Sequence, residues 1–71
     1  MNSERLVYMA NQIAGFFAAY PRDQAVASVT DHIKKFWDPR MRSALIEHAR
    51  VGGAGLGDVA SAAVRELEAH R

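Results

Sequence analysis

The fold is decided at Phe36-Trp37-Asp38-Pro39-Arg40, where one apolar helical pattern ends and a second begins. Aspartate is a preferred N-cap and proline is favoured at the first helical position, so Asp38-Pro39 predicts the start of a helix. The residue before a proline is pushed out of the α region, so the preceding helix must end here. Working outward from this point divides the chain into four helical segments.

Two of these segments precede the junction and carry apolar residues at helical spacing. The first is expected to begin after the N-cap Ser3 and to continue to Tyr20, where Pro21 stops it and opens the second segment as its first residue. Asp31 and Lys35 form a favourable i,i+4 pair on the wet face of the second segment. The expected core stripes are Leu6, Met9, Ala10, Ile13, Phe16, Phe17 and Tyr20, and then Val26, Val29, Ile33, Phe36 and Trp37.

The two segments after the junction are separated by glycines. Gly52-Gly53 is expected to close the third helix, and residues 52–57 together read as a flexible turn. Asp58 is the expected cap of the fourth helix, and His70 and Arg71 suit the negative end of its dipole. The apolar residues are Met41, Leu45, Ile46 and Ala49 in the third segment, and Val59, Ala60, Ala63, Val64 and Leu67 in the fourth.

No segment alternates between apolar and polar residues with β-branched enrichment, which argues against a sheet. The sequence therefore predicts an all-α fold for the single domain 1–71: a small bundle of about four short helices arranged as two helix hairpins, either compact or splayed open to hold something else.

Composition bounds what the chain can do. A chain of 71 residues can form only one small, here alanine-rich, core, and without cysteine it has no disulfide to support that core. Association with another chain is the expected source of stability. The net charge of +1 is small for a nucleic-acid binder. There is no apolar run long enough to span a membrane and no signal-peptide layout, so we expect a cytoplasmic protein.

Catalytic and metal-binding patterns are missing from the sequence. None of His32, His48 and His70 has a second histidine at i+3 or i+4, and there is no cysteine cluster. The serines lack nucleophile-elbow glycines, and the glycines at 52–57 follow a helix and lack the lysine of a phosphate-binding loop. We expect no catalytic residue, no metal and no cofactor on this chain.

The segment 34–42 is the first candidate binding surface. It gathers two lysines, two arginines and the only tryptophan, residue types that include those enriched in binding hot spots. Arg40 and Arg42 fall in the first helical turn, where the dipole disfavours cations by about 0.3–1 kcal/mol each. Either these residues form a solvated rim over a core of Phe36 and Trp37, or they dock a partner. The candidate partner-binding residues here are Phe36, Trp37, Arg40, Met41 and Arg42.

Helix one offers the second candidate. Tyr8, Gln12, Gly15 and Ala19 share a face nearly opposite the main apolar stripe. A glycine inside a helix costs about 1 kcal/mol relative to alanine, which is understandable if another backbone approaches closely at Gly15. Tyr8, Gln12 and Gly15 are therefore candidate partner-binding residues, with chance as the alternative explanation.

Three strings resemble one known family: residues 6–17 (LVYMANQIAGFF), residues 31–42 (DHIKKFWDPRMR) and residues 52–56 (GGAGL). They are similar to the delta subunit of the NAD-dependent, molybdenum-containing formate dehydrogenases, and the similarity spans residues 5 to about 67.

The resemblance implies an accessory, non-catalytic subunit of a cytoplasmic complex that oxidises formate and reduces NAD. The molybdenum cofactor, iron–sulfur clusters and FMN would belong to other subunits, and the partner would be the large catalytic subunit, with no nucleic acid or membrane involved. Three alternatives stay open: an assembly chaperone that leaves after cofactor insertion, a nucleic-acid-binding regulator that uses Lys34, Lys35, Arg40 and Arg42, and self-association of the isolated chain.

Overall fold

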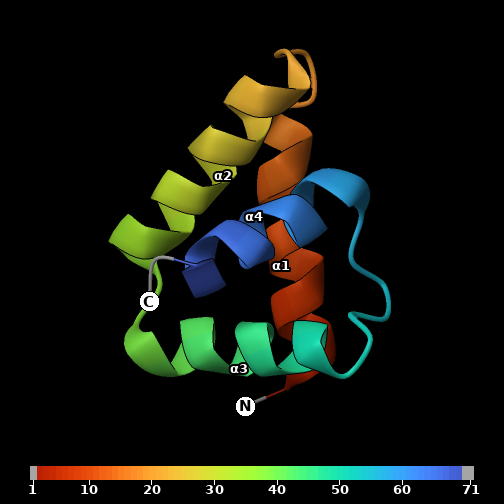
Figure 1. Cartoon of the computed structure of the whole chain (residues 1–71), viewed down its shortest axis with the longest axis vertical. Coiled ribbons are helices and arrows are strands. Elements are labelled where there is room, and N and C mark those ends of the chain that lie inside the picture. The colour runs from red at the N-terminus through yellow and green to blue at the C-terminus, as the bar shows by residue number, and fades with distance from the viewer. Residues whose placement is uncertain (1, 70–71) are drawn as a thin grey trace.

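The computed structural model describes residues 2–69 and consists of four helices (Figure 1). They are α1 (Ser3–Phe16), α2 (Arg22–Phe36), α3 (Pro39–Arg50) and α4 (Asp58–Ala69). The described residues contain no strand, so the predicted all-α small bundle is confirmed. Met1, His70 and Arg71 lie outside the described residues, and with them the predicted role of His70 and Arg71 at the end of the last helix.

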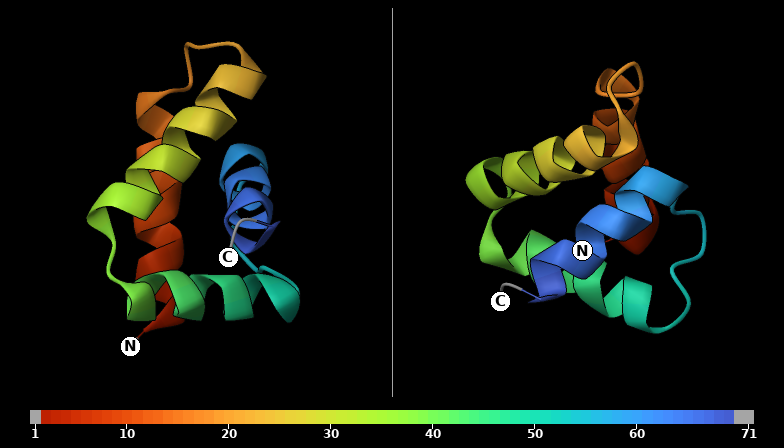
Figure 2. Two further views of the ribbon diagram at one scale, coloured as in Figure 1. Left: turned by 60° about the vertical axis from the view of Figure 1, so that its left-hand side comes forward. Right: turned by 45° about the horizontal axis from the view of Figure 1, so that its top comes forward.

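The helices pack as a compact bundle and not as two splayed hairpins. Figures 1 and 2 show α1 and α2 joined at one end of the molecule and α3 lying across the other end, with α4 between them. α4 contacts each of the other three helices, most extensively α2. None of the helices in the described part of the chain is long and apolar enough to cross a membrane.

The junction at Asp38-Pro39 forms as predicted. A carboxylate oxygen of Asp38 accepts a hydrogen bond from the backbone N–H of Met41 at 2.9 Å, and Pro39 is the first residue of α3. The start of α1 differs from the prediction, because Asn2 and not Ser3 is the N-cap. The side-chain oxygen of Asn2 accepts from the backbone N–H groups of Glu4 and Arg5, and asparagine caps a helix at least as well as serine.

α1 ends at Phe16, four residues before the predicted end at Tyr20. The backbone N–H of Tyr20 bonds to the carbonyl of Phe17 at 3.0 Å, so the chain turns instead of continuing the helix. As a result Phe16 is 82% exposed and Tyr20 52% exposed, and their predicted place in the core is wrong. Pro21 is the N-cap of α2, so the helix begins at Arg22 and not, as predicted, at Pro21.

The core gathers apolar side chains from all four helices. Phe36, predicted to be a core residue, is 72% exposed and instead lies against the ring of His32, with ring centroids 4.8 Å apart. Trp37 follows the helix in an extended conformation and is buried. The buried cluster is Leu6, Val7, Ala10, Ile13, Val29, Ile33, Trp37, Leu45, Ile46, Ala60, Ala63, Val64 and Leu67.

Side chains of α1 and α3 fasten the loop of residues 51–57. Asn11 donates from Nδ2 to the carbonyl of Gly55 at 2.8 Å and accepts the N–H of Gly57 at 2.9 Å. His48 Nε2 lies 2.8 Å from the carbonyl oxygen of Ala54. Gly52, Gly53 and Gly55 adopt positive φ angles, which explains the glycines there. The predicted turn is thus hydrogen-bonded to two helices, and its flexibility stays a prediction.

Asp58 joins two helices and does not cap one. The carbonyl of Gly57 accepts the N–H of Ser61, so α4 begins at Asp58 itself. The carboxylate of Asp58 forms a two-pronged ion pair with Arg22, at 2.7 and 3.0 Å, which ties the start of α4 to the start of α2. The predicted pair of Asp31 and Lys35 is confirmed, at 3.0 Å.

Replacement of Asn11 by alanine is expected to lower the free energy of unfolding by about 1–3 kcal/mol, because two hydrogen bonds of the loop are lost at once. Gln12→Ala is the matched control. The Gln12 side-chain amide is exposed, and among the described residues it bonds only to the Tyr8 hydroxyl, so its loss should change the free energy of unfolding by no more than about 0.5 kcal/mol. Urea unfolding followed by circular dichroism measures both. Equal effects of the two substitutions would contradict the anchoring role of Asn11.

Acid is expected to weaken the contact between α2 and α4. The hydrogen-bonded Arg22 guanidinium lowers the pKa of Asp58 below its ordinary value of 3.8. Since the folded chain then binds this proton less readily than the unfolded chain, the stabilisation is present above about pH 4 and is lost as the pH falls through the lowered pKa.

Urea unfolding of the native chain and of Asp58→Asn tests this expectation. The native chain should be the more stable of the two at neutral pH, and the difference should shrink as the pH falls through the lowered pKa of Asp58 and also in high salt. A difference that is independent of pH would show that Asp58 acts by some means other than its charge.

Candidate functional site

The 34–42 segment forms the corner between α2 and α3. The structure brings Phe36 and Arg40 to the surface, whereas Met41 is half-buried against the core and Trp37 is buried within it. Trp37 therefore supports the corner from inside. Of the aromatic pair, only Phe36 is available for contact with another molecule.

Arg42 has a local role that the sequence did not reveal. Its Nη1 donates to the carbonyl of Trp37 at 2.9 Å and to that of Lys34 at 3.2 Å, at the C-terminal end of α2. A cation is favoured at that end of a helix, so the position of Arg42 at the start of α3 is explained by the helix before it. The dipole argument for a partner now holds for Arg40 alone, which makes no ion pair within residues 2–69.

The second candidate surface lies on the outer side of α1. Tyr8 is 63% exposed, and its hydroxyl accepts a hydrogen bond from Gln12 Nε2 at 3.1 Å. Gly15 is exposed too, and a Cβ added there would meet nothing within 4 Å. Ala19 lies in the turn after α1. The structure thus brings Tyr8, Gln12 and Gly15 onto one exposed face, whose use by a partner stays a prediction, as does that of the 34–42 segment.

Two further aromatic residues are exposed at and after the end of α1, and reasoning from the sequence assigned both to the core. Phe16 follows Tyr8 and Gln12 at four-residue spacing, and Tyr20 comes next in the turn, where its ring meets that of Phe17 edge-on at 5.6 Å. Their exposure follows from the early end of α1. The sequence does contain a signal for the early end of α1. The run Ala18-Ala19-Tyr20-Pro21 offers few large apolar side chains that a further helical turn could bury.

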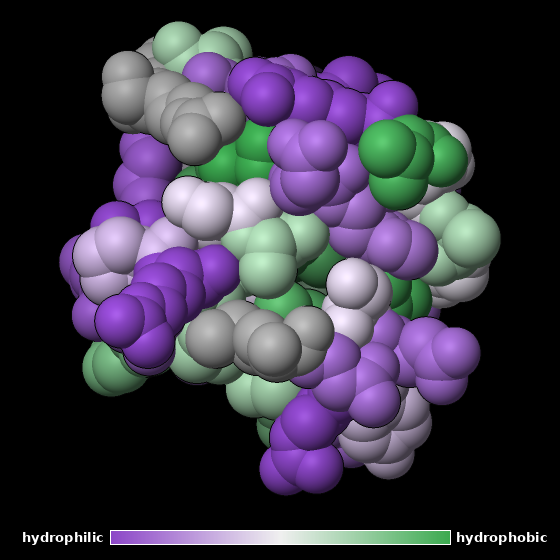
Figure 3. Space-filling model, turned by 90° about the horizontal axis from the view of Figure 1, so that it is seen from below, coloured by the Kyte–Doolittle hydropathy of each residue, from purple (hydrophilic) through white to green (hydrophobic). Residues whose placement is uncertain are grey.

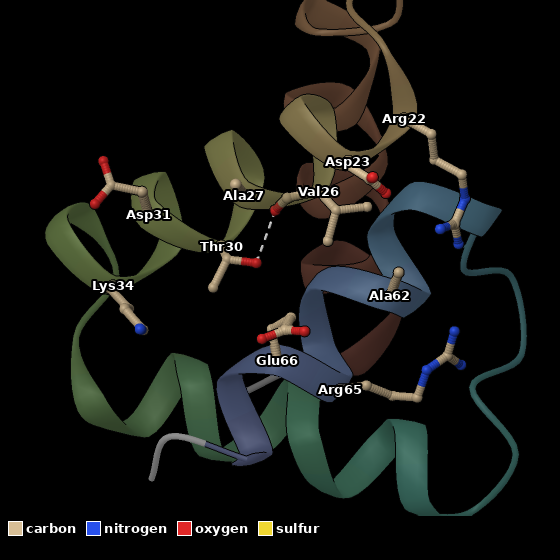
Figure 4. A pocket seen from close by; sticks show the side chains of 10 residues that line it. All are labelled: Arg22, Asp23, Val26, Ala27, Thr30, Asp31, Lys34, Ala62, Arg65 and Glu66. Carbon is tan, nitrogen blue, oxygen red and sulfur yellow. Dashed lines mark hydrogen bonds between the residues drawn. The ribbon is translucent and has the colours of Figure 1, made fainter.

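A surface groove of about 660 Å³ runs along the contact between α2 and α4 (Figure 4). Its walls carry charges of both signs, and Thr30 uses its hydroxyl to bond the carbonyl of Val26. Figure 4 shows the charged side chains distributed along both walls instead of converging on one point. The lining residues are Arg22, Asp23, Val26, Ala27, Thr30, Asp31, Lys34, Ala62, Arg65 and Glu66.

Among the described residues, 2–69, there is no group of three or more histidine and acidic side chains that could bind a metal ion together.

Arg50, whose pKa is raised by its hydrogen bond to Glu68, ties α3 to α4. The face below α3 is largely hydrophilic, with hydrophobic residues showing between the polar ones (Figure 3).

These features define a small helical protein whose exposed aromatic and cationic side chains suit contact with other molecules. Residues 5–64 match the model of the family of the delta subunit of NADH-dependent formate dehydrogenase, FdsD. The chain belongs to this family, which confirms the resemblance seen in the three sequence strings. No curated protein and no solved structure matched the chain.

Substitution of the two arginines separates the role of Arg42 from that of Arg40. Arg42→Ala is expected to lower the free energy of unfolding by about 1–2 kcal/mol, because two carbonyls at the end of α2 lose a charged donor. Arg40→Ala should change it by less than about 0.5 kcal/mol, since the side chain is exposed. Thermal unfolding of the isolated chain measures both, and a stable Arg42→Ala variant would refute the capping role.

Proposed function

We propose that this chain is a non-catalytic accessory subunit of a cytoplasmic, NAD-dependent, molybdenum-containing formate dehydrogenase. It docks on the large catalytic subunit and supports assembly, stability or full activity of the complex. The observation that carries this proposal is the family match over residues 5–64, most of the chain.

The residues of this chain do not fit the cofactors that the family implies for the whole complex. Iron–sulfur clusters are held mainly by cysteine thiolates, and the sequence has no cysteine. Residues 2–69 also lack a set of acidic and histidine side chains placed to bind a metal. We therefore assign the molybdenum cofactor, the iron–sulfur clusters, FMN and NAD to other subunits, and derive no reaction step on this chain.

The small core supports a binding role. The fully buried residues include Ala10, Ala60 and Ala63, which contribute little apolar area. A small domain of this kind gains stability from any partner that binds only its folded form. Docking on a large subunit would supply that stabilisation.

The charge pattern at 34–42 favours a protein partner over nucleic acid. Lys35 is paired with Asp31, and Arg42 is engaged with two carbonyls of α2. Of the four cations that the alternative requires, only Lys34 and Arg40 are left for phosphates, which is few for binding that rests on the backbone charge.

Co-expression with the large catalytic subunit tests the proposal. With an affinity tag on the large subunit, the untagged chain should be retained through purification, and its thermal unfolding should occur at higher temperature in the complex than alone. Deletion of the chain should reduce the yield or activity of the holoenzyme. Absence of retention together with an unaffected holoenzyme would refute the proposal.

The stoichiometry of the purified complex distinguishes a permanent subunit from the alternative, an assembly chaperone. A permanent subunit is present in purified active enzyme at a fixed ratio to the large subunit, whereas an assembly factor is found with cofactor-deficient complexes and is depleted from active ones. Quantitative mass spectrometry of the two fractions gives that ratio.

A further inference from the structure

We propose that the outer face of α1, extended by the α1–α2 turn, is the surface that docks, and that it fits an apolar, uncharged groove on another, larger subunit. We call this surface the α1 face and define it by Tyr8, Gln12, Gly15, Phe16 and Tyr20. The inference rests on the proposed function and names the site and the kind of surface that the partner presents.

The first argument is the distribution of charge. No charged residue or histidine occurs between Arg5 and Arg22, although Lys, Arg, Asp and Glu make up 24% of the chain. The exposed sides of the other helices do carry charge, for example at Lys35 in α2, Arg40 in α3 and Arg65 in α4. An exposed helix face without charge is the type of surface that a partner covers.

The second argument is the spacing of the exposed side chains. Tyr8, Gln12 and Phe16 follow one another at intervals of four, so they line one side of α1, and the Gln12–Tyr8 hydrogen bond shows that the first two meet. Tyr20 adds a further ring where the turn projects at the end of the molecule opposite α3 (Figures 1 and 2). Anchors at such spacing are typical of a helix that lies in a groove.

The third argument concerns Gly15. The fold of this chain does not require a glycine at position 15, because a Cβ added there would meet nothing within 4 Å and the φ angle of Gly15 is not positive. A glycine lowers the stability of a helix, so its presence at this position needs a reason outside this chain. A partner that approaches the backbone of α1 closely at Gly15 supplies one.

The exposed area points to a larger partner and not to a second copy of this chain. A whole aromatic side chain offers about 150–250 Å², so the exposed parts of Tyr8, Phe16 and Tyr20 amount to roughly 300–500 Å². A stable complex buries about 800 Å² on each side. Two α1 faces that meet along one line of contact bury little more than these side chains, whereas a groove that encloses the helix and the turn also covers the residues on either side of them.

The test replaces one exposed apolar side chain on this face and one elsewhere. Phe16→Lys places a cation on the last residue of α1, and Val51→Lys places one at the C-cap of α3, where the native valine is 76% exposed. Both cations lie at helix C-termini, where they are compatible with the dipole, so both variants should fold. Circular dichroism and the unfolding temperature of each isolated variant check this.

Each variant is co-expressed with the tagged large subunit and the retained amount is measured, followed by the dissociation constant for the purified pair. Phe16→Lys is expected to weaken binding about tenfold or more, as for a central aromatic anchor, and Val51→Lys to bind as the native chain does. Tyr8→Lys should also weaken binding. Gly15→Ala should leave the isolated chain at least as stable while weakening binding several-fold.

Native-like binding by both Phe16→Lys and Tyr8→Lys would overturn the inference while leaving the proposed function intact. Weakened binding by Arg40→Glu with unaffected binding by Phe16→Lys would place the docking surface at 34–42 and overturn it as well. So would a dimer of the isolated chain that Phe16→Lys dissociates, seen by light scattering. If the native chain is not retained and the holoenzyme is unaffected by its deletion, the proposed function fails first, and the inference fails with it.

Discussion

The structure depends on the close approach of α4 to the three helices around it. Ala60 and Ala63 are fully or almost fully buried in α4, and their small side chains let neighbouring backbones come near. Larger residues, Val64 and Leu67, fill the remaining space. Because five of the fifteen buried apolar residues are alanines, each pair of helices buries little apolar area, and the core needs side chains from all four. The bundle is therefore a unit of four helices, closed by the last one.

Polar contacts between the helices add to the stabilisation that the small core provides. Arg22–Asp58 and Arg50–Glu68 tie the two ends of α4 to α2 and α3, and Asn11 holds the loop that leads into it. These contacts are exposed, so each contributes modestly in water. Their value lies in geometry, because they fix where α4 enters and where it ends. A protein with so little apolar material to bury uses its polar side chains to choose one arrangement.

Signals that act within a few residues could be predicted from the sequence. Asp38 and Pro39 set the start of α3 by their own chemistry, and the glycines after Arg50 close it. Periodicity alone failed at Phe16 and Phe36, because an apolar spacing continues to the end of a helix whether or not a neighbour lies there to cover it. Both residues occupy the last position of a helix, and in each case the next residue, Phe17 or Trp37, packs against or within the core instead.

The contacts that decide the candidate surfaces join distant parts of the chain, and local patterns carry no trace of them. Arg42 bonds carbonyls only five and eight residues before it, but they lie across a helix boundary, at the C-terminal end of α2, so the helix that Arg42 begins does not indicate them. Asp58 was read as a cap, although its partner Arg22 begins a helix far away in the sequence. The outer side of α1 was partly recognised from Tyr8, Gln12 and Gly15. Its full extent depended on where α1 stops.

The fastening of the loop by Asn11 also bears on when the protein can fold as it is made. Asn11 bonds to residues 44 and 46 positions further along, and α4, which closes the core, is made after α1, α2 and α3. Until then the apolar sides of α1, α2 and α3 have no complete cover. Closure of the core thus waits until α4 has been made, and the nascent chain passes through a stage in which its core is open to other proteins.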